Sequence, residues 1–337
     1  MFALPVSIFA IFLAAAPLPG DLRTFRDWIV GCDNGRACQA VALLPDDGAE
    51  GATLAISRGP EQGAVPRIWV TPRAEGVPSP AALLIDGRRF ALRLDPRSQE
   101  LRVADAAGAA RMLGQATRIE ALVEEGGRRV LPISARGSAA ALLAMDESQR
   151  RLGTASALVR RGSATAVPPP PRLPAVSVPR TPRTAPRRLA MARVRQLLGR
   201  DATECEHAQD LDVEAFRLDA RASLVLAGHP CGNGAYNLFS SAFVVDERGR
   251  ATPARFDVGG GMGEGAAPDN MLVNADWDAD TRKLSTFARG RGLGDCGTIQ
   301  RYAWDGTRFR LVHQAEMGEC RESTDYITTW RARVIER

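Results

Sequence analysis

The chain has 337 residues, of which 45% are hydrophobic and 25% are charged, and its formal net charge is +5. These hydrophobic and charged fractions are those of an ordinary globular protein. The length is enough for about two domains of ~150 residues each. Lys283 is the only lysine, so the positive charge rests on arginine. Such arginine usage is typical of codon bias, and we expect no nucleic-acid partner.

The first 20 residues have the pattern of a secretory signal peptide. An apolar run from Phe2 to Ala16 is followed by small residues and prolines before the first charged residue, Asp21. A membrane-spanning helix needs about 20 apolar residues, and the flanking prolines make this run shorter than that. The sequence therefore predicts removal of residues 1–20 and a periplasmic or secreted mature protein.

The six cysteines agree with export, because an even number in an oxidising compartment is typical of disulfides. A zinc site would need paired CxxC or HxxxH spacing, whereas the three histidines are scattered. We expect no metal, and we favour disulfides over reactive-cysteine chemistry at Cys205 beside His207 or at Cys231 beside His229. Separation along the chain favours three sequential pairs: Cys32 with Cys38, Cys205 with Cys231, and Cys296 with Cys320.

Residues 21–162 are predicted to form an amino-terminal β-rich domain. Its first hairpin has Asn34 and Gly35 supplying positive φ at the turn, and a second has Asp86 and Gly87 between alternating apolar runs. Two helices are expected to interrupt the strands: residues 116–127, and residues 137–153 beginning at a Ser138 cap.

Residues 163–187 have the proline density of an extended spacer and predict a basic linker between two domains. No acidic residue occurs from Ser163 to Arg200, whereas eight arginines do. We favour a solubilised spacer, because charge keeps linkers extended. The alternative is weak contact with an anionic surface through the linker arginines Arg172, Arg180, Arg183 and Arg187.

Residues 188–337 are predicted to form a second β-rich domain stapled by disulfides. A helix over residues 186–201 opens it, and alternating stretches follow at intervals of about ten residues, as in a sandwich or barrel. The predicted fold is mainly β, with two antiparallel sandwich or barrel-like domains, a few short helices and the proline-rich linker.

The segment "GRGLGDCG" at residues 290–297 contains the GxGxxG spacing at Gly292, Gly294 and Gly297. A nucleotide site would need a helix directly after the glycines, but "TIQRYAW" alternates and is rich in β-formers. We therefore expect a glycine turn between two strands, with no nucleotide and no cofactor.

Two other segments resemble ligand loops only in part. "DWDAD" places Asp276, Asp278 and Asp280 at calcium-loop spacing but lacks the glycine and glutamate of that loop, so we expect a hairpin turn. "GGGMGEG" at residues 259–265 is followed by no GK[ST], so we expect a surface loop.

Several segments together resemble a family of secreted proteobacterial proteins known as domain of unknown function 1176. The amino-terminal half is also similar to the invasion-associated locus B family, through its Trp-then-Cys opening and the segment from Gly137 to Leu142. Neither resemblance implies a catalytic residue. The segments that carry the first are "FRDWIVGC", "MDESQRRLGTASALVRRG", "HPCGNGAYN", "FARGRGLGDCG", "YAWDGTRFRL" and "WRARV".

The sequence favours a non-catalytic binding or structural module of the cell envelope, whose partner is an envelope protein or polymer. Turns often carry recognition groups. The rival hypotheses are a hydrolase of an envelope polymer, using carboxylates such as Asp257, Asp276 and Asp295, and a secreted enzyme inhibitor. The predicted contact residues lie in "GNGAYN" and "FARGRGLGDCG": Asn233, Tyr236, Asn237, Arg289, Arg291 and Asp295.

Overall fold

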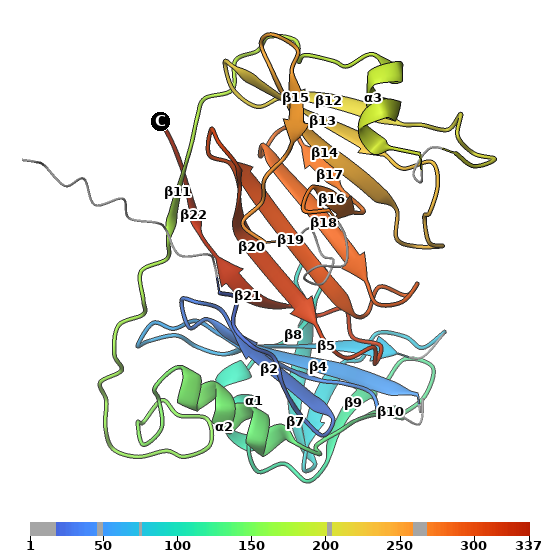
Figure 1. Ribbon diagram of the computed structural model, residues 1–337. Coiled ribbons are helices and arrows are strands. Elements are labelled where there is room, and N and C mark those ends of the chain that lie inside the picture. Colours follow the sequence, from blue (N-terminus) through green and yellow to red (C-terminus); the bar gives the residue numbers. More distant parts are fainter. Residues whose placement is uncertain (1–17, 46–49, 74–75, 201–203, 259–267) are drawn as a thin grey trace, which may run out of the picture.

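The computed structural model of the chain describes residues 18–45, 50–73, 76–200, 204–258 and 268–337 (Figure 1). Nearly all of the predicted signal peptide and the whole "GGGMGEG" segment lie outside these residues. Among the described residues, no helix has the length and apolar character needed to cross a membrane.

The amino-terminal region forms one ten-stranded sheet in the order β1-β2-β3-β4-β5-β8-β7-β6-β9-β10, with every described pair antiparallel. Its strands are β1 (Arg23–Phe25), β2 (Trp28–Cys32), β3 (Cys38–Ala42), β4 (Gly51–Arg58), β5 (Arg67–Arg73), β6 (Ala82–Ile85), β7 (Arg88–Leu94), β8 (Leu101–Val103), β9 (Ile119–Val123) and β10 (Arg129–Ile133).

Turn chemistry explains the hairpins of this sheet. Asp86 and Gly87 have φ of 48° and 81°, as predicted for the β6–β7 turn. The prediction for the β2–β3 turn was wrong in detail, because the positive φ of 63° belongs to Arg36 rather than to Asn34 or Gly35. The Asp33 carboxylate accepts the Gly35 and Ala37 amides and fixes the turn from its first residue.

The described residues contain three helices: α1 (Ala106–Leu113), α2 (Ser138–Ser148) and α3 (Met191–Leu198). The helix predicted over residues 137–153 is confirmed as α2. The helix predicted over residues 116–127 is wrong, because this segment supplies β9. Ile119, Leu122 and Val123 have helical spacing, but β9 lies between two strands and is buried on both faces, where strand pairing overrides that spacing.

The carboxy-terminal region forms two five-stranded sheets and a two-stranded ribbon, and no sheet of the described residues closes into a barrel. The first sheet contains β12 (Val213–Arg217), β13 (Ala222–Gly228), β14 (Phe239–Asp246), β15 (Ala251–Pro253) and β16 (Met271–Val273). The second contains β17 (Asp276–Asp278), β18 (Lys283–Arg289), β19 (Gly297–Trp304), β20 (Phe309–Met317) and β21 (Ile327–Arg331).

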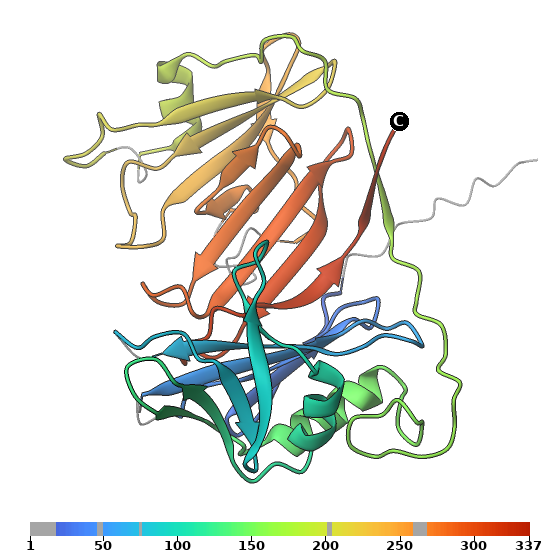
Figure 2. The same cartoon turned by 180° about the vertical axis from the view of Figure 1, so that it is seen from behind.

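Three sheets are stacked, with the β17–β21 sheet in the middle (Figures 1 and 2). Leu224, Trp277 and Tyr302 belong to the core between the two carboxy-terminal sheets. Ile29 and Val41 of the amino-terminal sheet pack with Ile327 of β21 in a separate core. The division of the chain at residues 163–187 stays a prediction.

The linker contains one strand that its composition does not predict. β11 (Ala175–Val178) pairs in parallel with β22 (Arg333–Glu336), the last strand of the chain. Val176 and Val178 are buried against Ala303 and Val312, so this part of the predicted linker is ordered by packing on the carboxy-terminal region. The strand that pairs with β11 is β22, more than 150 residues further along the chain, so the composition around β11 cannot reveal this pairing.

All three predicted disulfide pairs are present: Cys32 with Cys38, Cys205 with Cys231, and Cys296 with Cys320. The Cys205 and Cys231 sulfurs are therefore joined to each other and are not thiols. Three disulfides in one chain indicate that the protein folds in an oxidising compartment.

The segment "MDESQRRLG" builds a buried polar network, called here the Arg58 network: Arg58, Asp146, Gln149 and Arg151. The Arg58 guanidinium contacts Asp146 at 2.6 Å and Gln149 at 2.6 Å. The second Asp146 oxygen accepts the amides of residues 158 and 159, while Arg151 donates to backbone carbonyls of residues 60–62. This motif therefore holds two loops against α2.

Candidate functional site

The two loops predicted to carry recognition groups lie against one another, although they connect strands of different sheets. One joins β13 to β14 and the other joins β18 to β19. The Asn237 side chain bridges them, because its Nδ2 donates to the Arg289 carbonyl at 2.9 Å and its Oδ1 accepts the Arg289 amide at 3.1 Å. These two segments are called the paired loops below.

Asn274 is the centre of the paired loops. Its Nδ2 lies 3.1 Å from the Tyr236 carbonyl, 3.1 Å from Asn237 Oδ1 and 2.8 Å from the Phe287 carbonyl. Its Oδ1 accepts the Leu238 amide at 3.0 Å. With φ of 46°, Asn274 also makes the turn between β16 and β17. One side chain thus fixes the β13–β14 loop against β18.

The paired loops expose three large apolar side chains. Tyr236, Leu238 and Leu293 are 37%, 55% and 65% exposed. The Tyr236 hydroxyl lies 3.4 Å from the Gly290 carbonyl, and its ring lies beside Gly292, where a Cβ would be 3.6 Å from Tyr236 Cδ1. Ordered backbone therefore presents an aromatic and two aliphatic side chains to solvent.

Asn233 has a local role within its own loop. Its Nδ2 donates to the His229 carbonyl at 2.7 Å and its Oδ1 accepts the Phe239 amide at 2.8 Å. The disulfide from Cys205 to Cys231 anchors the same loop.

Three charged residues stiffen the β18–β19 loop. Arg289 stacks over Phe287, with its guanidinium carbon 5.0 Å from the ring centroid. Arg291 contacts both oxygens of Asp295, at 2.8 Å and 2.5 Å, and reaches Glu322 at 3.2 Å. Burial by itself would raise the pKa of Asp295, but hydrogen bonds from Arg291 and from the Glu322 amide hold it below its usual value.

The glycine turn is confirmed as a connection between two strands. β19 begins at Gly297 directly after the motif, so a strand stands where a nucleotide site needs a helix. Gly294 and Gly297 have φ of 67° and 136°, whereas Gly292 does not have a positive φ. A Cβ at Gly297 would lie 2.1 Å from the Ala288 carbonyl oxygen. Backbone geometry accounts for two of the three glycines.

A recess of about 300 Å³ adjoins the paired loops. Asp210, Asp212 and Glu214 line one side of it, and His229 and Asn274 line another. Burial lowers the pKa of His229, whose Nε2 lies 2.8 Å from Ser241 Oγ. The described residues contain no group of three His, Cys, Asp or Glu side chains arranged to hold a metal ion.

The carboxylates named for a hydrolase do not form a pair. Asp257 contacts Arg310 and the Leu311 amide near the end of β19, whereas Asp295 precedes its first residue. Because a strand rises ~3.3 Å per residue, the length of β19 puts Asp257 and Asp295 about 20 Å apart. The two carboxylates of an inverting glycosidase are at most ~9.5 Å apart. Asp276 is exposed on β17, two strands away. Asp278 caps the β17–β18 turn by accepting the amides of Asp280 and Thr281, as expected for "DWDAD".

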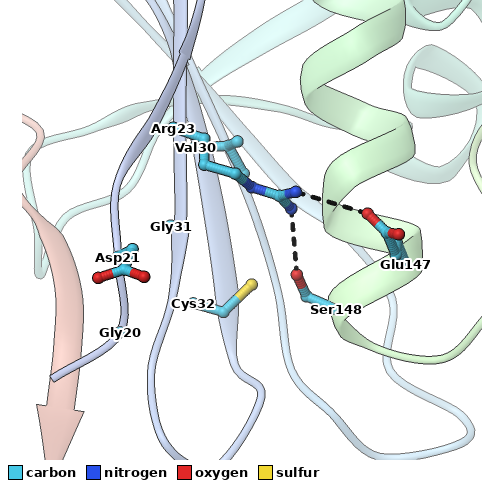
Figure 3. Close-up of a pocket in the computed structure, with 8 residues that line it drawn as sticks. All are labelled: Gly20, Asp21, Arg23, Val30, Gly31, Cys32, Glu147 and Ser148. Carbon is cyan, nitrogen blue, oxygen red and sulfur yellow. Dashed lines mark hydrogen bonds and ion pairs between the residues drawn. The ribbon is translucent and has the colours of Figure 1, made fainter. Parts of the chain in front are cut away.

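A further recess, of about 440 Å³, lies between β1, β2 and the end of α2 (Figure 3). Arg23 reaches across it to Glu147 and Ser148, at 3.5 Å and 3.4 Å, and Cys32 of a disulfide lines it. Arg23 and Glu147 are both well exposed, so this ion pair contributes little to stability. The Ser148 hydroxyl in the lining of the recess donates to the Ala144 carbonyl at 3.0 Å rather than to a carboxylate.

A sequence profile described as "Protein of unknown function (DUF1176)" matches residues 22–333. The chain belongs to the DUF1176 family. It is 31% identical over 345 residues to "Uncharacterized protein YpfG" of Escherichia coli (strain K12), with 93% of this chain and 94% of that protein covered. No solved structure matches it.

In this DUF1176 member, the structure brings five of the six predicted contact residues together where the paired loops meet, and it adds Asn274, which sequence reasoning missed. That these residues contact a ligand stays a prediction. The sixth predicted contact residue, Asn233, fixes its own loop. A signal for Asn274 was present: an asparagine between two short apolar strands is typical of positive φ at a turn. Its contacts with two distant loops need the fold.

Proposed function

We propose that this protein is an exported component of the bacterial cell envelope that acts as a non-catalytic binding module through its paired loops. Its partner is an envelope protein or polymer. The signal-peptide pattern of residues 1–20 and the three disulfides support export.

One observation carries the proposal. Loops from two sheets are locked together by Asn237 and Asn274, yet they expose Tyr236, Leu238 and Leu293. Locking lowers the entropy that the loops lose on binding, and exposed aromatic and aliphatic groups supply contact area. A rigid apolar surface of this kind suits recognition of another molecule.

The linker adds a second, weaker contact to this proposal. Arg172, Arg180 and Arg183 are exposed. Near an anionic surface, each would contribute attraction of ~1 kcal/mol, and salt would screen it.

The test is capture of envelope components by the mature protein and two matched variants. Leu293→Asp places a charge on the paired loops, and Leu94→Asp places one at a similarly exposed leucine of β7. We expect one partner to be retained by the wild type and Leu94→Asp and lost by Leu293→Asp. Equal capture by all three proteins would contradict the proposal.

The rival hypotheses predict other results when the same envelope components are used. Turnover of a purified envelope polymer would favour the hydrolase, whose named carboxylates lie apart. Inhibition of a co-purifying enzyme, lost in Leu293→Asp, would favour a secreted inhibitor acting through the same loops.

A further inference from the structure

A recess of about 340 Å³ lies at the end of the β17–β21 sheet, where β17 ends, β18 begins and β19 ends. Trp277 and Trp304 line it from the sheet, and Leu218 lines it from the β12–β13 turn. Val178 of β11 and Val334 of β22 form a further wall. Figures 1 and 2 show β11 and β22 running side by side along this sheet. Its volume is that of a small-molecule site, and its lining combines an apolar wall with a charged one.

The two indole rings are held in place. Trp277 stacks on Phe216 with ring centroids 5.9 Å apart, and Trp304 Nε1 donates to Asp219 at 2.6 Å. They line the recess but are only 9% and 6% exposed, so most of each ring is packed in the core. A ligand would meet rigid aromatic edges that need no rearrangement.

The recess also contains a cation that makes no direct ion pair. Lys283 lines it and is half-buried, and its ammonium makes no hydrogen bond or ion pair with any described residue. The neighbouring Arg282 is paired with Glu336. Asp278 stands opposite Lys283 across the hairpin and attracts it without direct contact, while both Asp278 oxygens accept hydrogen bonds from the turn. Asp280, also in the lining, is exposed on that turn.

We propose that this recess binds a small molecule carrying an apolar ring or chain and a single carboxylate or phosphate. The apolar group lies against Trp277 and Trp304, and the anion pairs with Lys283. A half-buried ammonium has lost part of its hydration, and a charge-assisted hydrogen bond restores it. Lysine is a compact charge on a flexible stem and can reach one oxygen of either anion.

The test measures binding of four naphthyl compounds to the full mature protein by calorimetry. The probes are 1-naphthylacetate, 1-naphthyl phosphate, the neutral 2-(1-naphthyl)ethanol and the cationic 2-(1-naphthyl)ethylamine. We expect at least one anion to bind about tenfold more tightly than the alcohol, the gain of one hydrogen bond to a charged group. The tighter anion identifies the headgroup. Absence of saturable binding by both anions, or tighter binding of the amine, would overturn the proposal.

Variants then locate the site. Lys283→Gln should bind the anion no more tightly than the alcohol, Lys283→Arg should keep most of the preference, and Arg248→Gln, at an exposed turn arginine, should change nothing. The indole N–H signals of Trp277 and Trp304 should shift on binding, and those of the other tryptophans should not. Unchanged affinity in Lys283→Gln, or shifts at the other tryptophans alone, would exclude this recess.

Discussion

The Arg58 network and the paired loops are both polar segments that stand out in the sequence, and the fold treats them in opposite ways. In the Arg58 network, the Arg58 and Asp146 side chains are 1% and 0% exposed and satisfy one another. In the paired loops, the hydrogen bonds lie beneath the surface and apolar side chains point outward. The side chains of a sequence motif that identifies a family can therefore be buried and serve stability rather than recognition.

The contrast also separates two uses of hydrogen bonding. The Arg58 network joins α2 to loops of the same region, so its loss should act on stability alone. The Asn274 bonds join two sheets and hold a surface, so their loss should act on local order as well as on stability. Each prediction below tests one side of this difference.

The largest effect is expected from Asp146→Ala, which leaves the Arg58 guanidinium buried without a counter-charge. Breaking a buried pair in this way costs about 3–5 kcal/mol of unfolding free energy, measured by urea denaturation. The matched control is Glu147→Ala, one residue along the same helix, whose exposed pair with Arg23 is worth ~0–1 kcal/mol. Similar losses in both variants would show that Arg58 is not in a buried network.

A smaller loss is expected from Gly297→Ala. Its φ of 136° disfavours any side chain, and the added Cβ would meet the Ala288 carbonyl. Backbone strain of this kind costs about 1–3 kcal/mol before the clash is relieved. Gly292→Ala, in the same motif, meets only the Tyr236 ring at 3.6 Å and should stay within ±0.5 kcal/mol, as surface changes usually do. Thermal melts of Gly297→Ala and Gly292→Ala measure the difference. Equal destabilisation of the two variants would contradict a role of positive φ at Gly297.

Asn274→Ala should cost about 1–2 kcal/mol, because it removes several hydrogen bonds at a position with positive φ. Hydrogen exchange should accelerate at residues 233–238 and 289–291 and stay unchanged around the Arg58 network. Acceleration spread evenly over the chain would mean that Asn274 does not act on the paired loops.

The smallest effect concerns pH at the contact between the amino-terminal sheet and β21. Burial raises the pKa of Asp325, whose Oδ1 accepts Trp69 Nε1 at 2.7 Å. The folded state then binds more protons than the unfolded state above the unfolded pKa of ~3.9, so this group lowers stability as pH rises through the raised pKa. Asp325→Asn keeps an acceptor and removes the titration. Stability should therefore fall less with rising pH in Asp325→Asn than in the wild type, and parallel curves would contradict the shift.

Local patterns predicted much of this structure because their causes are local. The Asp86–Gly87 turn, α2 and the strand after Gly297 each depend on neighbouring residues. The three disulfide pairs followed from separation along the chain. Residues 116–127 were mistaken for a helix because β9 is decided by the strands on either side of it. The contact of the paired loops, the Asn274 bonds and the Lys283 recess join distant segments, and no spacing along the chain encodes them.

The ribbon of β11 and β22 has a consequence for the order of folding. β11 lies at residues 175–178, but its partner is made of residues 333–336, which are synthesised much later than β11. Ile327, which packs on the first sheet, emerges almost as late. Contacts of such long sequence separation form slowly because a long loop must close first. The Ile29 and Val41 surface of the amino-terminal sheet therefore stays uncovered until Ile327 has been made, long after the strands of that sheet themselves.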